Sequence, residues 1–256
     1  MIYARHMPVD TAGMNTPAHQ GSESPRTIGL IGGMSWESSA EYYKLINQEV
    51  RSRLGPLRSA SLLMFSVDFG PIEQAQHAGR WDDLAGMLED AARRLHRGGA
   101  DCVVLCTNTM HKVADRIVAA VPIPFLHIAD PVGREATRTG AQVLGLLGTR
   151  FTMEQPFMRD RLARDHGLQV LVPDEPDRAE VHRIIYEELC TGVVRDASRK
   201  TYQRIIESLA QRGAQAVVLG CTEITLLIQP QDSVLPVLDT TRLHSQAAVD
   251  FALGGR

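Results

Sequence analysis

The stretch G-A-D-C-V-V-L-C-T-N at residues 99–108 reappears as G-A-Q-A-V-V-L-G-C-T at residues 213–222, aligned without gaps. Each stretch follows an amphipathic segment that ends in Arg-Gly, and each precedes a short apolar run that contains a proline. Two further runs match upstream of them, T-I-G-L-I-G-G-M from Thr27 and V-L-G-L-L-G-T-R from Val143. Two copies in the same order predict two similar αβ lobes related by internal duplication.

Apolar runs alternate with segments of helical periodicity along the rest of the chain. We expect strands at residues 27–31, 61–67, 102–105, 125–128, 143–147, 169–172, 216–219 and 234–238. The clearest helical segments are residues 81–95, 154–165, 178–189 and 198–211. Continuous apolar strands separated by helices are typical of parallel sheets covered on both faces. The sequence therefore predicts an α/β fold of two αβα lobes with mostly parallel sheets and an active site between them.

These lobes divide the chain. Residues 27–130 form the predicted N-terminal α/β lobe, which the C-terminal residues 240–256 rejoin, and residues 131–239 form the C-terminal α/β lobe. Residues 1–26 are rich in Pro, Ser, Gly and His and have no apolar periodicity. We expect a disordered tail there.

The composition argues against several classes of protein. A net charge of −3 gives no electrostatic reason to expect nucleic acid or an anionic membrane as a partner. No apolar run approaches the roughly 20 residues that span a bilayer, and the N-terminus lacks the layout of a signal peptide, so we expect a cytoplasmic protein. Four cysteines without a C-x-x-C pair argue against a disulfide framework or a structural zinc site.

The repeat pairs two positions at the ends of its strands. Cys221 aligns with Thr107, not with Cys106. Side chains alternate along a strand, so Cys106 points away from Thr107 and is expected to pack in the core, as are Cys102 and Cys190. Equivalent positions of duplicated lobes tend to face their interface. We therefore predict that Thr107 and Cys221 belong to the active site.

Both positions end a strand and begin a turn toward a helix, where ligands of α/β sheets gather. Free N–H groups at a helix start lower the pKa of a thiol and bind carboxylates, so G-C-T-E at residues 220–223 predicts a thiolate with polar neighbours. A lone cysteine there is also compatible with a small buried residue. In T-N-T-M-H, from Thr107 to His111, the polar residues either cap the next helix or contact a ligand. His111 either orients the site or lies on an exposed face.

The opening loop G-L-I-G-G-M-S, from Gly29 to Ser35, is not a G-x-G-x-x-G dinucleotide fingerprint. We interpret it as a tight turn that lets the backbone approach a small ligand. The sequence has no Walker loop, H-E-x-x-H, G-x-S-x-G or metal-ligand spacing. A site without cofactor or metal is the expectation.

The motifs G-L-I-G-G-M-S-W-E, C-T-N-T-M-H and G-C-T-E-I together resemble those of the aspartate/glutamate racemase family, and the closest likeness is to bacterial broad-specificity amino-acid racemases. The resemblance runs from about Thr27 to the C-terminus. It implies two αβ lobes, a homodimer, and racemisation of an amino acid at its α-carbon without pyridoxal phosphate, metal or nucleotide. Two acid/base residues then lie on opposite sides of the α-carbon, one removing the proton and the other returning one.

Most members of the family use two cysteines, the first directly before Asn-Thr, but here that position holds Thr107. A hydroxyl is far less acidic than a thiol, so Thr107 is the poorer base. We therefore expect Thr107 and Cys221 to act unequally on the two enantiomers.

The resemblance also implies substrate contacts at Met34, Ser35, Gln76, Asn108, Thr109 and Thr222. Asn and Thr at helix starts suit the α-carboxylate. Members that take aspartate carry a basic residue near the Gln76 segment, whereas here the segment offers Glu73 and Gln74, with Arg80 only further on. This weakens the case for a strictly acidic substrate. Arg178 or Arg183 are possible substitutes, although both also fit solvated charges.

Two other functions remain open. The first is a carbon-acid decarboxylase or isomerase on the same scaffold, because one cysteine suffices to protonate an enolate. The second is a catalytically silent ligand-binding protein that has lost a catalytic cysteine.

Overall fold

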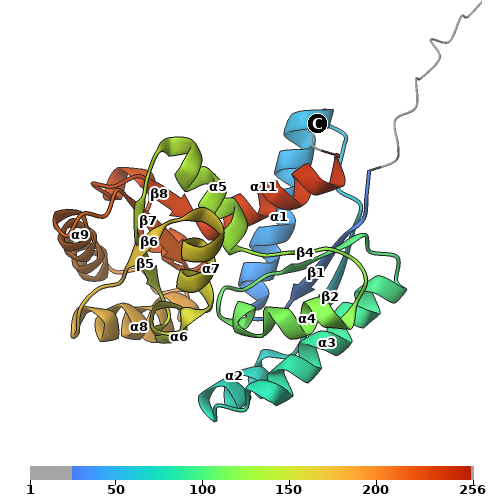
Figure 1. Cartoon of the computed structure of the whole chain (residues 1–256), viewed down its shortest axis with the longest axis horizontal. Coiled ribbons are helices and arrows are strands. Elements are labelled where there is room, and N and C mark those ends of the chain that lie inside the picture. The colour runs from blue at the N-terminus through green and yellow to red at the C-terminus, as the bar shows by residue number, and fades with distance from the viewer. Residues whose placement is uncertain (1–24, 255–256) are drawn as a thin grey trace, which may run out of the picture.

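The chain folds into two lobes, each built on a four-stranded parallel sheet with helices on both faces (Figure 1). The computed structural model describes residues 25–254, so apart from Pro25 and Arg26 the tail predicted for residues 1–26 lies outside the described residues. No helix within residues 25–254 is long and apolar enough to cross a membrane.

The first lobe contains β1 (Ile28–Gly32), α1 (Trp36–Leu54), β2 (Leu62–Ser66), α2 (Phe69–His77), α3 (Trp81–Arg97), β3 (Cys102–Leu105), the 3-10 helix η1 (Thr109–Val113), α4 (Ala114–Ala120) and β4 (Phe125–Leu126). The second begins with α5 (Ala129–Thr139), β5 (Val143–Gly148), α6 (Arg150–Glu154), α7 (Pro156–His166), β6 (Gln169–Leu171) and α8 (Asp177–Glu187). It continues with η2 (Leu189–Thr191), α9 (Asp196–Gln211), β7 (Ala216–Gly220), α10 (Ile224–Leu227), η3 (Pro230–Asp232) and β8 (Val237–Asp239), and α11 (Thr240–Ala252) is the last described helix.

The two sheets have the same strand order, β2-β1-β3-β4 and β6-β5-β7-β8, and every described pairing is parallel. Their registers also agree. Leu30 pairs with Val104 in the first sheet, and the aligned residues Leu146 and Val218 pair in the second. The α/β fold of two similar lobes predicted from the repeat is therefore confirmed.

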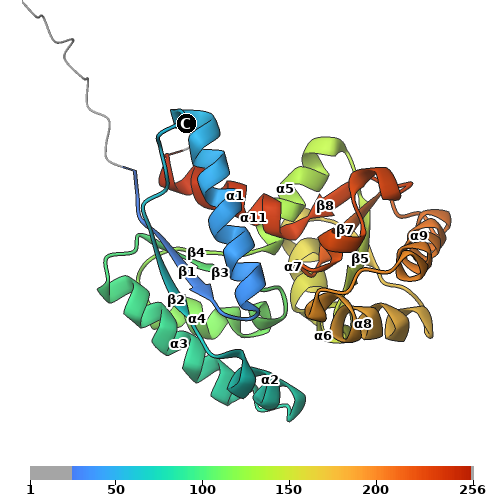
Figure 2. The same ribbon diagram turned by 180° about the vertical axis from the view of Figure 1, so that it is seen from behind.

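The helix that follows the last strand of each sheet packs on the other sheet. Helix α5 follows β4, but Val132 and Ala136 pack with Leu144 and Val218 of the second lobe. Helix α11 follows β8, but Val249 packs in a cluster of the first lobe, and Figure 2 shows α11 beside α1. The chain thus crosses between the lobes twice, which ties them together around the strand ends.

Strand β3 is buried on both faces, as its continuous apolar sequence requires. Val103 and Leu105 face α3, whereas Cys102 and Cys106 face α1 and α11. Cys106 is fully buried, so its predicted role in packing is confirmed.

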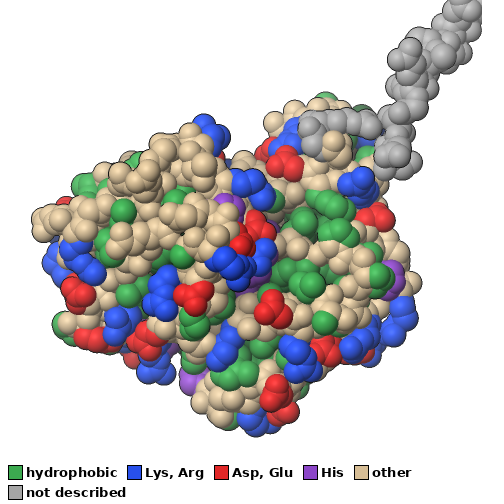
Figure 3. Space-filling model, viewed as in Figure 1, with side chains coloured by type: hydrophobic (Ala, Val, Ile, Leu, Met, Phe, Trp, Pro, Cys, Tyr) green, Lys and Arg blue, Asp and Glu red, His purple; other side chains and the backbone are tan. Residues whose placement is uncertain are grey.

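Charged side chains of both signs are interspersed over the outer surface seen in Figure 3, without a large patch of one sign among the residues coloured there.

Three buried histidines contact one another next to β4. His111, His127 and His244 are 2%, 5% and 0% exposed. The ring of His111 lies 4.6 Å from that of His127 and 5.8 Å from that of His244. Burial lowers the pKa of His127 to about 3, that of His244 to about 4, and that of His111 well below its ordinary value.

These pKa values predict a loss of stability in mild acid. The unfolded chain takes up protons below its ordinary histidine pKa of about 6.5 while the folded cluster stays neutral, so unfolding becomes more favourable as the pH falls. Between about pH 7 and about pH 5, each histidine should lower the free energy of unfolding by on the order of 2 kcal/mol. Urea denaturation at both pH values measures this. Equal stability at the two would contradict the neutral cluster.

Candidate active site

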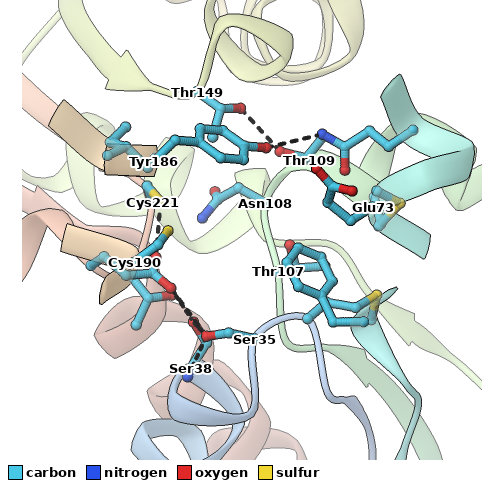
Figure 4. A pocket seen from close by; sticks show the side chains of 18 residues that line it. Ser35, Ser38, Glu73, Thr107, Asn108, Thr109, Thr149, Tyr186, Cys190 and Cys221 are labelled. Carbon is cyan, nitrogen blue, oxygen red and sulfur yellow. Dashed lines mark hydrogen bonds between the residues drawn. The ribbon is translucent and has the colours of Figure 1, made fainter. Parts of the chain in front are cut away.

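A cavity of about 170 Å³ lies between the lobes at the carboxyl ends of β3 and β7 (Figure 4). All eight predicted site residues line it: Met34, Ser35, Gln76, Thr107, Asn108, Thr109, Cys221 and Thr222. Thr107 and Cys221 approach it from opposite lobes, as the repeat requires of equivalent positions. The structure therefore brings the predicted residues together, while the role of each stays a prediction.

Thr107 is held in place through its backbone. The Nδ1–H group of His111 donates to the Thr107 carbonyl at 2.8 Å, and Nε2 of His111 accepts from the Ile128 N–H at 3.2 Å. Both ring nitrogens are used, so the buried ring is neutral and has one defined tautomer. Of the two roles considered for His111, the exposed-face one is wrong. The histidine positions the loop that carries Thr107.

Cys221 is held through its side chain. Its thiol donates to Oε2 of Glu223 at 2.9 Å, and Oε1 of the same carboxylate accepts from Ser35 and Ser38 at 3.2 Å each. Ser35 caps α1, so Glu223 links the second lobe to the start of the first helix of the first lobe. The cavity thus presents Cys221 with a proton acceptor already in contact.

The thiolate predicted at Cys221 is wrong for this structure. Burial raises the pKa of the thiol well above its ordinary value, and the Glu223 carboxylate raises it further. The expected helix effect is small because α10 has only four residues, although the Glu223 N–H lowers the thiol pKa somewhat. At neutral pH Cys221 is therefore a thiol that donates a hydrogen bond.

Asn108 lines the cavity, and its amide oxygen lacks a hydrogen-bond partner among the described residues. Its Nδ2 donates to Oγ1 of Thr240 at 3.1 Å, and that hydroxyl donates in turn to the Leu219 carbonyl at 2.8 Å. Because the Thr240 proton is already used, the amide of Asn108 must point its NH₂ group there. Its Oδ1 is then buried without a hydrogen-bond partner among the described residues, on a side chain only 5% exposed. An orphaned buried acceptor suits an N–H donor of a ligand.

Hydroxyls and one amide complete the walls. Thr109 contacts the hydroxyls of Thr149 at 3.2 Å and of Thr152 at 3.3 Å in the other lobe. Thr222 contacts the hydroxyl of Thr241 at 3.1 Å. Gln76 of the first lobe donates to the Tyr186 hydroxyl of the second lobe at 3.4 Å, so this contact also joins the two lobes.

Sequence reasoning missed several lining residues. The packing role predicted for Cys190 is wrong, because the residue is exposed and lines the cavity. The cavity walls still enclose its thiol in part, and this partial burial raises its pKa to about 12. Sequence reasoning assigns no role to Glu223, although its place two residues after Cys221 is a usable signal. Met110 and Gly220 lie inside the quoted motifs and Glu73 in the Gln76 segment, although none was predicted as a site residue. No local signal marks the remaining lining residues, which are Ser38, Phe69, Thr149, Ile185 and Tyr186.

Two glycines of the opening loop are required by close packing. Gly33 has φ +96°, and a Cβ there would lie 2.1 Å from the Val67 carbonyl oxygen. A Cβ at Gly32 would lie 2.6 Å from Oγ of Ser39. Neither glycine lines the cavity, whereas Met34 and Ser35 after them do, so the predicted approach of this backbone to a ligand stays a prediction.

Among the described residues, the lining contains no lysine, arginine or histidine. Arg178 pairs with Glu154 at 3.0 Å and Arg183 with Glu180 at 2.7 Å, so both fit solvated charges rather than substrate ligands. Within the described part of the chain, no group of three or more His, Cys, Asp or Glu side chains is arranged to hold a metal ion.

Comparisons with known proteins agree with this geometry. The profile of the Asp/Glu/hydantoin racemase family matches residues 31–248. The structure of a candidate Asp/Glu racemase from Yersinia pestis is 52% identical with a TM-score of 0.85, over 89% of this chain and 99% of that one. An aspartate racemase homologue from Pyrococcus horikoshii OT3 is 32% identical with a TM-score of 0.79, at the same 89% and 99% coverage.

A curated relative resembles almost the whole chain. The broad specificity amino-acid racemase RacX of Bacillus subtilis (strain 168) is 22% identical over 231 residues, which cover 88% of this chain and 98% of RacX. With the family profile spanning both lobes and the cavity between them, this chain belongs to the Asp/Glu/hydantoin racemase family.

Proposed function

We propose that the protein is an amino-acid racemase independent of pyridoxal phosphate, in which Thr107 and Cys221 act on opposite faces of the α-carbon. One observation carries the proposal: two equivalent positions of a duplicated fold line one cavity from opposite lobes. The racemases among the relatives support the same reaction. The homodimer and the cytoplasmic location expected from the sequence stay predictions.

The substrate is a zwitterion, and the cavity offers partners for both of its charges. The unpaired Oδ1 of Asn108 accepts from the α-ammonium group. This differs from the α-carboxylate contact expected of Asn108 from the sequence, because the amide orientation is fixed by Thr240. The hydroxyls of Thr109 and Thr222 are the donors for the α-carboxylate, on which charge builds up as the α-proton leaves.

Proton removal at Cys221 requires the Glu223 carboxylate. The thiol proton moves to Oε2 of Glu223 along the existing 2.9 Å hydrogen bond, and the resulting thiolate takes the α-proton of the substrate. The C–H bond breaks, an S–H bond forms, and the electron pair is delocalised into the α-carboxylate. The Thr107 hydroxyl then protonates the planar intermediate from the other face. Glu223 loses its proton to solvent and the Thr107 oxygen takes one up from solvent, which restores the starting state.

Removal of the α-proton is harder from the other enantiomer because Thr107 must then act as the base. An aliphatic hydroxyl is far less acidic than a thiol, and the residue two positions after Thr107 is Thr109, a neutral side chain, where Cys221 has Glu223. The two half-sites therefore differ in both the reacting atom and its proton acceptor. This supports the expected bias toward one enantiomer.

We predict unequal exchange of the α-proton for the two enantiomers of one substrate. In D₂O, the enantiomer whose α-proton faces Cys221 should exchange about tenfold faster or more, as followed by ¹H NMR. Thr107→Cys should speed the slower enantiomer, whereas Thr107→Ser, which keeps the oxygen, should retain the bias. Cys221→Ala should abolish exchange of both.

Equal exchange of both enantiomers by the wild-type protein would refute the asymmetry. Absence of exchange from every amino acid tested would refute the racemase itself. In that case, carbon dioxide release from a dicarboxylic carbon acid would separate the decarboxylase from a ligand-binding protein without catalysis.

We also predict that Glu223→Gln lowers the pKa of Cys221, because it removes the negative charge that raises it. The pH profile of Cys221 alkylation by iodoacetamide measures this in a Cys190→Ser background, since Cys190 is also exposed to the cavity. The profile should move to lower pH while α-proton exchange falls. Glu73→Gln removes the other carboxylate of the cavity and is the control, so it should leave the pH profile of alkylation unchanged. An unchanged profile in Glu223→Gln would show that the Glu223 charge does not raise the pKa of Cys221.

A further inference from the structure

The ionisable side chains that line the cavity are, among the described residues, all acids. They are Glu73, Tyr186, Cys190, Cys221 and Glu223. Burial raises the pKa of Tyr186 and of Cys190 to about 12 each and that of Cys221 well above its ordinary value, so these three groups are neutral near pH 7. The charge of the cavity lining therefore comes from the two glutamates and is negative.

The carboxylate of Glu223 is held by uncharged donors. Its contacts are the hydroxyls of Ser35 and Ser38 and the thiol of Cys221. Hydroxyl donors stabilise a carboxylate but leave its charge in the cavity. This carboxylate is also already committed to the proton of Cys221 in the proposed reaction.

Glu73 is the charged group that remains for the substrate. It lies on α2, on the wall formed by the first lobe, and is labelled in Figure 4 close to Thr109. Its Oε1 lies 3.0 Å from Nδ1 of His77, one turn further along the helix, and this contact offsets the charge only while His77 is protonated. The Glu73 side chain is 40% exposed, so a substrate can reach it.

The neighbouring cations are engaged elsewhere. Arg80 pairs with Asp83 at 2.9 Å, and the ammonium of Lys112 lies 3.7 Å from the centre of the Trp81 ring. Arg178 and Arg183 pair with glutamates of their own lobe. An acidic side chain in the cavity would therefore add a third carboxylate without a matching cation, which is unfavourable at the short distances of an enclosed site.

We infer that the racemase selects amino acids whose side chain donates hydrogen bonds, an ammonium group first and a hydroxyl second, and that Glu73 is the residue that selects them. This inference rests on the proposed function and adds the substrate class to it. The zwitterion keeps its α-ammonium at Asn108, and its side chain extends toward Glu73. Aspartate and glutamate are disfavoured by the same carboxylate.

Three ligands of similar size test the inference: L-diaminobutyrate, L-homoserine and L-aspartate. The first two differ only in carrying an ammonium or a hydroxyl group on the same carbon. We expect kcat/KM for α-proton exchange to fall in that order, with diaminobutyrate about tenfold above aspartate. Glu73→Gln should lower the ratio of diaminobutyrate to homoserine several-fold, and Glu73→Lys should raise aspartate above diaminobutyrate.

Glu180→Gln is the matched control. Glu180 is a helical glutamate with similar exposure, 38%, in an ion pair with Arg183, and it lies outside the cavity lining. Its substitution should leave the ratio of diaminobutyrate to homoserine unchanged. Because the readout is a ratio of two substrates in one preparation, partial misfolding of a variant cancels from it.

Binding separates failure of this inference from failure of the racemase. Calorimetric titration of Cys221→Ala with the three ligands ranks their affinities without turnover, and Cys221→Ala/Glu73→Gln shows whether the ranking depends on Glu73. The same order in binding, lost without Glu73, supports the selection even if no exchange is found. Aspartate binding as tightly as diaminobutyrate, or a ranking unchanged in the double variant, overturns it.

Discussion

The contact of Glu223 with both lobes is the interaction on which the site depends. One carboxylate accepts from Ser35 and Ser38 at the start of α1 and from the thiol of Cys221. It joins the two lobes beside the cavity, and it holds the sulfur of Cys221 in place. The negative charge of Glu223 raises the pKa of Cys221, and in the proposed reaction the same carboxylate accepts the thiol proton.

The duplication explains why this contact exists. In the ungapped alignment Glu223 is equivalent to Thr109, and each contacts the N-cap of the helix that follows the first strand of the other lobe. Thr109 contacts Thr149, the N-cap of α6, as Glu223 contacts Ser35, the N-cap of α1. Two related contacts therefore join the lobes among the residues that line the cavity. The fold provides the symmetry, and the side chains at 109 and 223 break it.

The fold and the location of the site were predictable because both follow from local pattern. Buried parallel strands read as continuous apolar runs, and the repeat alone pairs Thr107 with Cys221. The state of the site was not predictable in this way. The pKa of Cys221 depends on its burial and on the Glu223 carboxylate. The exposure of Cys190 depends on the position of η2 beside the cavity. The role of His111 depends on Ile128, on the connection to the second lobe. These are tertiary contacts that periodicity does not report.

The difference between residues 109 and 223 explains why a hydroxyl rather than a thiol can serve at position 107. A second thiol there would lie beside Thr109, a neutral residue, so it would lack the carboxylate that assists Cys221. The hydroxyl can still deliver a proton to a strongly basic carbanion, which needs a donor but no pre-formed base. His111 fixes the backbone of Thr107 rather than its hydroxyl, so the side chain keeps its freedom to donate. In the proposed reaction one half-site is therefore better suited to removing a proton and the other to returning one, and residues 109 and 223 make the rates of α-proton exchange unequal for the two enantiomers.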